Sequence, residues 1–249
     1  MKCCWMMAAA ASLALTLPAG AANATEINLL CTNALKSVVE DVGPQFEKAT
    51  GHKLKIEYSS TGPARAKIER GAAIDVAILG TGAIDGLIKQ GKLAGATRTD
   101  IARSALGVAI RKGAPKPDLS SAQSFKQAML NSKGIACSEG GLTGDYLKVL
   151  FGRLGIAEQM RAKTVLARGA EAVAEGKAEF GLTQISEILP IAGVELAGPF
   201  PKDIQEYTVF PGAVSANAKE AEAAKALLKY LTAPDAAKAM KAKGLKPAT

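Results

Sequence analysis

Aromatic side chains and histidine are scarce in this sequence, and each scarcity narrows the functions that it can have. Only 4% of the 249 residues are aromatic, which disfavours a site that stacks nucleobases or sugars on aromatic rings. His52, the single histidine, follows Gly51 in a polar turn, and we expect it at the surface, since a lone histidine without partners performs no chemistry. No Gly-x-Ser-x-Gly elbow, paired-histidine metal motif, Walker loop or metal-ligand cluster is present. We therefore expect a protein that is not an enzyme, with no catalytic residue, no cofactor and no metal.

Long apolar runs are confined to the first residues. Residues 1–24 join Lys2, an apolar stretch and the small residues Ala22-Asn23-Ala24, which is the arrangement of a cleaved secretory signal peptide. No later run approaches the ~18 apolar residues that a transmembrane helix needs. We expect the mature chain to be soluble and exported to the periplasm.

Cysteine is almost absent once the signal peptide is removed. Cys3 and Cys4 leave with it, and Cys31 and Cys137 remain, each after a short apolar run. Two small buried thiols are one interpretation. A periplasmic disulfide is the other, and it requires the two Cα atoms to lie within ~7 Å of each other.

Basic residues are in excess, giving a formal net charge of +8, but they are scattered and often stand beside acids. Nucleic-acid binding usually needs a focused basic patch, so this distribution favours a small anionic ligand or a negatively charged cell surface.

Strand and helix patterns alternate at short spacing, which predicts a parallel α/β sheet. The expected strands are 27–30, 53–58, 74–79, 105–110, 134–138, 164–167, 180–184 and 208–214. The expected helices are 35–49, 64–70, 83–90, 124–130, 145–154, 171–175, 185–189, 218–230 and 234–240. The pattern runs twice, so we expect two lobes, 25–106 with 208–249 and 107–207. The Gly/Pro/Ser loop 112–121 is a place where the chain can leave one lobe. The segment 196–207 is polar and proline-bearing, and 208–214 can return to the first lobe.

Three hydroxyls and a glycine stand where one helix begins, at Ser59-Ser60-Thr61-Gly62 before Pro63. The first N–H groups of a helix lack intrahelical partners and face the positive end of the helix dipole, so such a turn binds anions. A simple hydroxyl cap is the alternative. Similar turns follow other predicted strands, and ligands bind beyond the carboxyl ends of strands in open α/β sheets.

The order of these turns resembles that of the periplasmic molybdate-binding proteins of bacterial ABC importers. The resemblance is carried by 30–35, by Ser59-Ser60-Thr61, by 75–78 and by Arg168-Gly169-Ala170 before 181–183. It implies a two-lobed type II periplasmic-binding-protein fold with two crossovers and the ligand in the interlobe cleft. It also implies a monomer that delivers a small anion to an ABC permease in the inner membrane, with no nucleic acid involved.

The resemblance also implies a ligand site made of neutral hydrogen-bond donors. The residues that it places there are Asn33, Ala34, Ser60, Thr61, Thr143, Ala167 and Gln184. Thr61 retains a hydroxyl donor of the family, whereas Ala34 replaces a serine and Gln184 a tyrosine. Two of three side-chain donors have therefore changed. Molybdate or tungstate is expected from the resemblance, and an organic carboxylate is the alternative.

Two arginines bear on that alternative, because a guanidinium binds a carboxylate with two hydrogen bonds. Arg65 lies in the first turn of the helix that Thr61 starts, and Arg168 lies in a predicted cleft turn. Either could contact the ligand, or each could form a surface ion pair with Glu69 or Glu171. The sequence therefore predicts a periplasmic solute-binding protein, with a hydrolytic or other enzyme as the alternative of another class.

Overall fold

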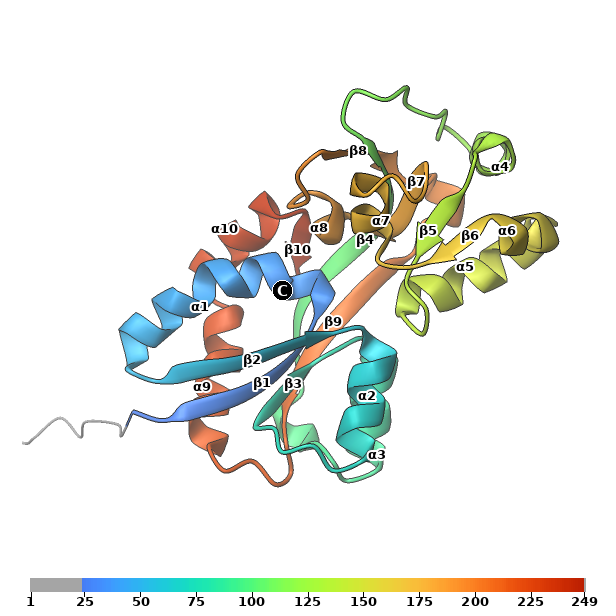
Figure 1. Ribbon diagram of the computed structural model, residues 1–249. Helices are drawn as coiled ribbons and strands as arrows, with labels where there is room; N and C mark the ends of the chain where they lie inside the picture. Colours follow the sequence, from blue (N-terminus) through green and yellow to red (C-terminus); the bar gives the residue numbers. More distant parts are fainter. Residues whose placement is uncertain (1–23, 249) are drawn as a thin grey trace, which may run out of the picture.

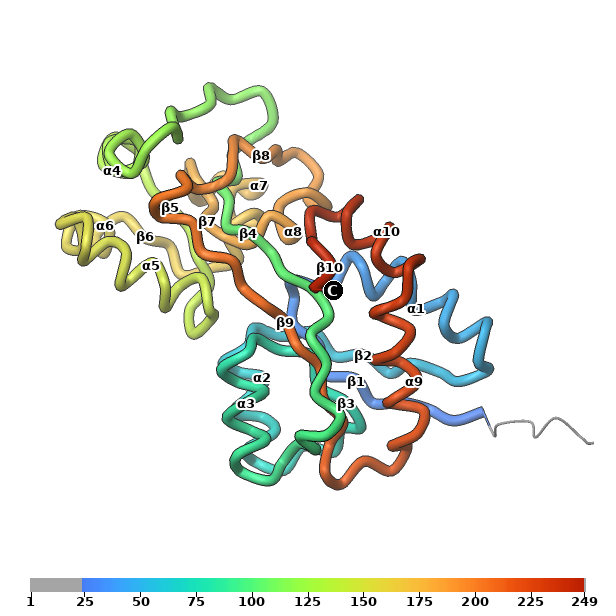
Figure 2. Tube along the Cα trace, turned by 180° about the vertical axis from the view of Figure 1, so that it is seen from behind, coloured from blue at the N-terminus to red at the C-terminus, as the bar shows by residue number. Residues whose placement is uncertain are grey.

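Two long strands run through the whole molecule and join its two halves (Figures 1 and 2). The chain was analysed as a computed structural model, which describes residues 24–248. Strand β4 (Thr99–Arg111) pairs antiparallel with β9 (Tyr207–Val214) through residues 99–105. Further along, residues 106–109 of the same strand pair antiparallel with β7 (Phe180–Gln184). One strand thus belongs to the sheets of both lobes.

The first lobe is a sheet in the order β2-β1-β3-β9-β4, in which β1, β2 and β3 are parallel. Helices α2 and α3 pack on one face, and α1, α9 and α10 pack on the other. Its remaining elements are β1 Glu26–Thr32, η1 Asn33–Leu35, α1 Lys36–Thr50, β2 Lys53–Ser59, α2 Thr61–Glu69, β3 Val76–Ile78, α3 Thr81–Lys89, η2 Gly95–Thr97, α9 Ala221–Leu231, α10 Pro234–Ala242 and β10 Leu245–Pro247.

The helices of this lobe follow from apolar periodicity and glycine ends. In α1 the buried residues Val38, Val42 and Phe46 recur at helical spacing and face the sheet. Gly51 then ends the helix with φ of 79°, a left-handed conformation that glycine adopts without steric cost.

The second lobe repeats the arrangement, with β7, β5 and β6 parallel and β4 antiparallel beside β7. Helices α4, α5 and α6 cover one face, and α7 and α8 lie on the other. Its remaining elements are α4 Ala122–Asn131, β5 Ile135–Cys137, α5 Leu142–Arg153, α6 Ala157–Lys163, β6 Thr164–Leu166, α7 Gly169–Ala174, α8 Ile185–Ile188, β8 Val194–Pro199 and η3 Lys202–Ile204.

The predicted two-lobed α/β class is confirmed, with differences in single elements. Strand β8 lies at 194–199, where part of a polar connecting segment was expected, because its residues pair with β4 while only half buried. Strand β10 and helix α6 were also not foreseen. The predicted lobe boundary at 106/107 falls inside β4, close to where that strand changes partners.

The structure bears only in part on the expected signal peptide and on the expected state of the two cysteines. Apart from Ala24, the predicted signal peptide lies outside the described residues. Within residues 24–248, no helix has both the length and the apolar character to cross a membrane. Cys31 and Cys137 are both free and buried, and they lie in β1 and β5, in different lobes.

Candidate functional site

The carboxyl ends of strands from both lobes meet at one small cavity. We call it the cleft cavity, and its volume is about 30 Å³. The residues that line it are Thr32, Asn33, Ala34, Ser60, Thr61, Ser138, Gly141, Leu142, Thr143, Thr183, Gln184, Glu187 and Phe210. All but Phe210 lie at or just after the ends of β1, β2, β5 and β7, the location expected for a ligand in an α/β sheet.

Two long helices begin at the cleft cavity without a side-chain cap. Ser60 is the N-cap residue of α2 and Gly141 that of α5, and neither makes a side-chain capping hydrogen bond. Their first N–H groups are therefore not satisfied by a capping side chain and point toward the place where an anion would sit. Thr61 also lines the cavity, and its hydroxyl accepts a hydrogen bond of 3.3 Å from the Gly80 N–H, so its own proton remains available for a ligand.

Gln184 connects the second lobe to the strand that crosses between the lobes. Its amide Nε2 donates to the Thr208 hydroxyl at 3.1 Å and lies 3.5 Å from the Thr143 hydroxyl. The side chain is only 4% exposed, and its Oε1 atom has no hydrogen-bond partner among residues 24–248. An unpaired buried acceptor costs free energy, so this oxygen indicates a place for a hydrogen-bond donor on a ligand or water.

Glu187 brings a carboxyl group to the cleft cavity. It lies in the short helix α8, which packs against η1 and α1 of the first lobe. The Thr183 hydroxyl donates a hydrogen bond to its Oε2 atom. Burial raises the pKa of Glu187, and the Thr183 hydrogen bond and the charge of Arg168 oppose that rise.

The lobes touch each other beside the cleft cavity. A Cβ atom at Gly62 would lie 2.2 Å from the Gly140 carbonyl oxygen, and one at Gly80 would lie 2.4 Å from Leu142 Cδ1. Both distances are far below van der Waals contact. At Gly62 the obstacle is a backbone carbonyl, so this approach of the two lobes requires glycine there, whereas at Gly80 the end of the Leu142 side chain would have to move. The structure is therefore a closed form.

Six of the nine residues expected in the site line this cavity: Asn33, Ala34, Ser60, Thr61, Thr143 and Gln184. The structure does not bring the other three to it. The Ala167 N–H donates to the Cys137 carbonyl at 3.1 Å, and β6 is the outermost strand of its sheet, remote from the first lobe.

Both arginines form ion pairs on their own helices. Arg65 Nε lies 2.9 Å from Glu69 Oε1, and its guanidinium packs over Gly86 of α3. Arg168 NH2 lies 2.5 Å from Glu171 Oε1. The surface ion pairs considered as alternatives are thus present, and neither arginine lines the cleft cavity.

Sequence reasoning did not single out Ser138, Gly141, Thr183, Glu187 or Phe210. For Glu187 a signal existed, because it is the only acid in the apolar run 185–189 that follows a predicted strand end. Phe210 offered no signal, since its place depends on β9 crossing between the lobes.

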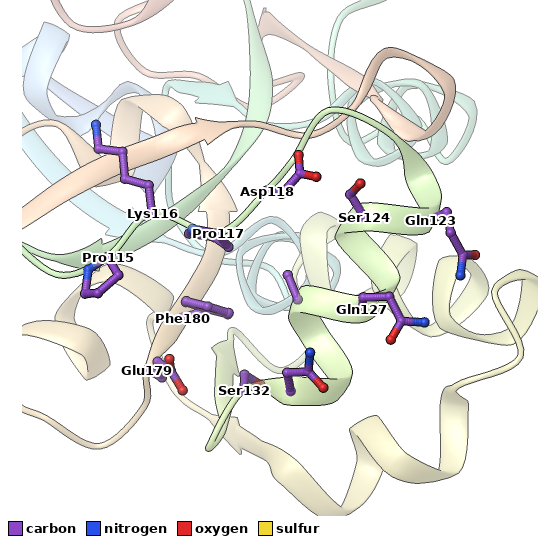
Figure 3. A pocket seen from close by; sticks show the side chains of 12 residues that line it. Pro115, Lys116, Pro117, Asp118, Gln123, Ser124, Gln127, Ser132, Glu179 and Phe180 are labelled. Carbon is purple, nitrogen blue, oxygen red and sulfur yellow. The ribbon is translucent and has the colours of Figure 1, made fainter.

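A larger hollow of the second lobe lies elsewhere (Figure 3). It has a volume of about 550 Å³ and is lined by polar side chains of α4, by residues of the 115–118 loop and by Glu179 and Phe180. Phe180 is the first residue of β7, so this hollow lies at the amino end of that strand, opposite the cleft cavity. Within residues 24–248, no group of three or more His, Cys, Asp or Glu side chains is placed to hold a metal ion.

Comparison with known proteins agrees with this geometry. Residues 27–246 match the family described as bacterial extracellular solute-binding protein. This chain belongs to that family. The solute-binding protein is 26% identical to the molybdate-binding protein ModA of Azotobacter vinelandii over 92% of each chain. Its fold superimposes on the periplasmic molybdate-binding protein of that organism with a TM-score of 0.73, at 24% identity, covering 88% of this chain and 98% of the other. The resemblance to molybdate-binding proteins is confirmed.

A third relative corrects one expectation. The solute-binding protein is 34% identical to a protein named aconitate isomerase from a Pseudomonas species, over 90% of this chain and 88% of that one. The expectation that the chain is not an enzyme is wrong, because this relative, similar along nearly its whole length, is named as one. The expectation rested on the absence of histidine-based and metal-based motifs, whereas a single carboxylate can transfer a proton without any sequence motif.

Proposed function

We propose that this solute-binding protein binds a small organic polycarboxylate in the cleft cavity and isomerises an unsaturated one. The relative named aconitate isomerase supports this reaction class. The observation that carries the proposal is the carboxyl group of Glu187 in a cavity whose other polar groups are neutral.

An acid beside the ligand discriminates between the two anion classes considered. A fully ionised tetrahedral oxyanion has no proton to share, so Glu187 would repel it or would have to be protonated first. An ionised organic acid is repelled in the same way, but it also has C–H groups that a carboxylate can approach and deprotonate. The site then favours the second class.

The other polar groups suit the carboxylates of such a ligand. The N–H groups at the starts of α2 and α5 and the hydroxyl of Thr61 are donors from both sides of the cleft. The Gln184 Oε1 atom is an acceptor for a protonated oxygen. A polycarboxylate is too large for a closed cavity of about 30 Å³, which is room for about two water molecules. We therefore propose that the lobes rotate apart about β4 and β9 to admit it.

Capture of molybdate or tungstate is the second candidate function. The small cavity, the neutral donors of the first lobe and the likeness to ModA favour it. In that case the closed protein would deliver the oxyanion to an ABC permease in the inner membrane. Under either function we propose a monomeric protein of the periplasm, which the predicted signal peptide and the periplasmic relative support.

A thermal-shift panel separates the two functions. The mature chain would be stripped of ligand and tested with cis-aconitate, trans-aconitate, citrate, molybdate, tungstate and sulfate. A ligand at ~100 times its Kd adds ~2.7 kcal/mol of stability, which raises the Tm by several degrees. We expect a shift with the tricarboxylates. A shift with molybdate and tungstate alone would refute the polycarboxylate proposal and support the second candidate.

A further inference from the structure

We propose that Glu187 is the single base that removes a proton from the bound anion and returns it to a different carbon. This inference rests on the proposed function, and it adds the residue and the route of the proton. It follows from the position of Glu187 in the cleft, the hydrogen bond that holds it and the absence of another structural use for its charge.

Glu187 is held at the border between the lobes. It follows β7 by three residues, and Thr183 at the end of that strand donates a hydrogen bond to its carboxyl group. Helix α8 packs on η1, so the carboxyl group faces a cavity that Asn33 and Ala34 line from the other side. A ligand gripped by both lobes would therefore lie against it.

The charge of Glu187 has no structural role within residues 24–248, where it takes part in no salt bridge. The charged groups that act on it are Arg168 and Glu171, which lie 2.5 Å apart and largely satisfy each other. Glu187 is half buried, and an acid that is partly withdrawn from water without a counterion is unfavourable in the folded state; such groups concentrate at functional sites. Because burial raises its pKa toward the operating pH, Glu187 suits a general base that must later act as an acid.

The proposed step needs no cofactor and no second reactant. The ligand is an unsaturated polycarboxylate with a CH₂ group between a carboxylate and a C=C bond. The ionised Glu187 takes one proton from the CH₂ carbon, and the electron pair of that C–H bond forms a new C=C bond. The electrons of the original C=C bond move to its far carbon, which accepts the proton back from Glu187. The double bond has then moved by one position, and neither atoms nor electrons are gained or lost.

Neighbouring groups assist this step without exchanging protons with the ligand carbon. Negative charge spreads onto a ligand carboxylate as the proton leaves, and the N–H groups at the start of α5 and the Thr143 hydroxyl are placed to stabilise it. Thr183 is a positioning residue, because it acts only through its hydrogen bond to Glu187.

The test uses the mature full chain with cis-aconitate and trans-aconitate in D₂O, followed by proton NMR, with Kd measured by calorimetry. The variants are Glu187→Gln, Thr183→Val and the control Glu158→Gln, whose side chain is 79% exposed on α6. We expect Glu187→Gln to slow isomerisation and deuterium uptake about 10²- to 10⁴-fold, the range for loss of a general base, while Kd changes less than about tenfold. The control should match the wild type.

Thr183→Val tests the positioning role of Thr183 through the pH dependence of the rate, which a purely structural role of Thr183 would leave unchanged. The wild-type rate should rise with pH through the pKa of Glu187. Loss of the Thr183 hydrogen bond, which lowers that pKa, should move the inflection to higher pH.

The outcomes separate this inference from the proposed function. If Glu187→Gln binds and isomerises aconitate as the wild type does, Glu187 is not the base, although the proposed function stands. If the wild type binds aconitate but neither isomerises it nor exchanges its protons, the isomerase function falls and this inference falls with it. If the wild type binds neither isomer, the ligand class itself is wrong.

Discussion

Both lobes meet the cleft cavity with hydroxyls and one side-chain amide, that of Asn33 in the first lobe and that of Gln184 in the second, whereas only the second lobe adds a carboxyl group, that of Glu187. Both faces are built in the same way, from turns at the carboxyl ends of parallel strands. Under the proposed function, the donors of the first face would hold the anion, and the second face, with Glu187, would decide which anion is held and what happens to it.

The lobes also differ in the burial and hydrogen bonding of an acidic residue that precedes one of their strands. In the first lobe Asp75, just before β3, is 2% exposed and accepts hydrogen bonds from the N–H groups of Asn28, Lys219 and Glu220. In the second lobe Glu179, just before β7, is exposed and accepts one from the Lys133 N–H. The acids occupy corresponding positions, but only Asp75 is buried.

The largest expected effect is the loss of stability when Asp75, the buried acid of the first lobe, is replaced. Asp75→Ala leaves three partly buried N–H groups without their acceptor, so we expect a loss of about 2 kcal/mol in the free energy of unfolding. Glu179→Ala should cost about 0.5 kcal/mol, as for a surface residue. Urea denaturation of both variants measures the difference. Equal losses of unfolding free energy in the two variants would contradict the conclusion that Asp75 stabilises its lobe more than Glu179 does.

The pH dependence of Asp75 gives the same comparison a second measurement. Burial alone would raise the pKa of Asp75, but the hydrogen bonds from Asn28, Glu220 and Lys219 outweigh it and hold the pKa below its ordinary value. Asp75 thus stabilises the fold above its unfolded pKa of about 3.9, and this stability is lost as the pH falls through the folded pKa. Asp75→Ala should lose less stability than the wild type on acidification over that range.

A smaller effect is expected where the two faces meet. A methyl group at Gly62 would collide with the Gly140 carbonyl in the closed form, while Gly82, in the next helix, has open space around the added Cβ atom. Overpacking of this kind costs about 1–3 kcal/mol, so Gly62→Ala should lower the free energy of unfolding of this closed form by that amount. Urea denaturation should find Gly82→Ala unchanged. Wild-type stability in Gly62→Ala would show that the free protein does not hold the two lobes in this contact.

The smallest expected effect is the pH dependence of stability that Glu187 gives to the second lobe. Since burial raises the pKa of Glu187, the folded chain holds its proton at pH values where the unfolded chain, with a pKa of about 4.3, has lost it. Stability therefore falls as the pH rises above about 4.3 toward the folded pKa. Glu187→Gln removes this slope and should be more stable than the wild type at pH 7, with the difference vanishing near pH 4. If the free energies of unfolding of the wild type and of Glu187→Gln depend on pH in the same way, the pKa of Glu187 is not raised in the folded chain.

Local patterns predicted the strand ends, and these position most of the site. Strand β7 begins and ends at Phe180 and Gln184 as predicted, and the Ser60 and Thr61 turn lies at the cleft cavity. Periodicity and glycine turns act over a few residues, so a single sequence reveals them.

What was missed depends on the arrangement of strands in space. Ala167 lies at the end of a predicted strand, as Gln184 does, but β6 lies at the sheet edge, and only the topology shows this. Arg65 is on a helix that starts at the cavity, yet its side chain pairs with Glu69 on the outer surface. Glu187 lies three residues beyond the end of β7, in a short helix whose place beside the first lobe depends on the fold.

Proton uptake on binding tests most directly whether the second face, with Glu187, meets the ligand. Calorimetric titrations with cis-aconitate in two buffers of different ionisation enthalpy give the number of protons bound per ligand, for the wild type and for Glu187→Gln. A negative ligand raises the pKa of a neighbouring acid, so the wild type should take up a fraction of a proton more than the variant. Equal uptake by the two proteins would place the ligand away from Glu187 and contradict the account.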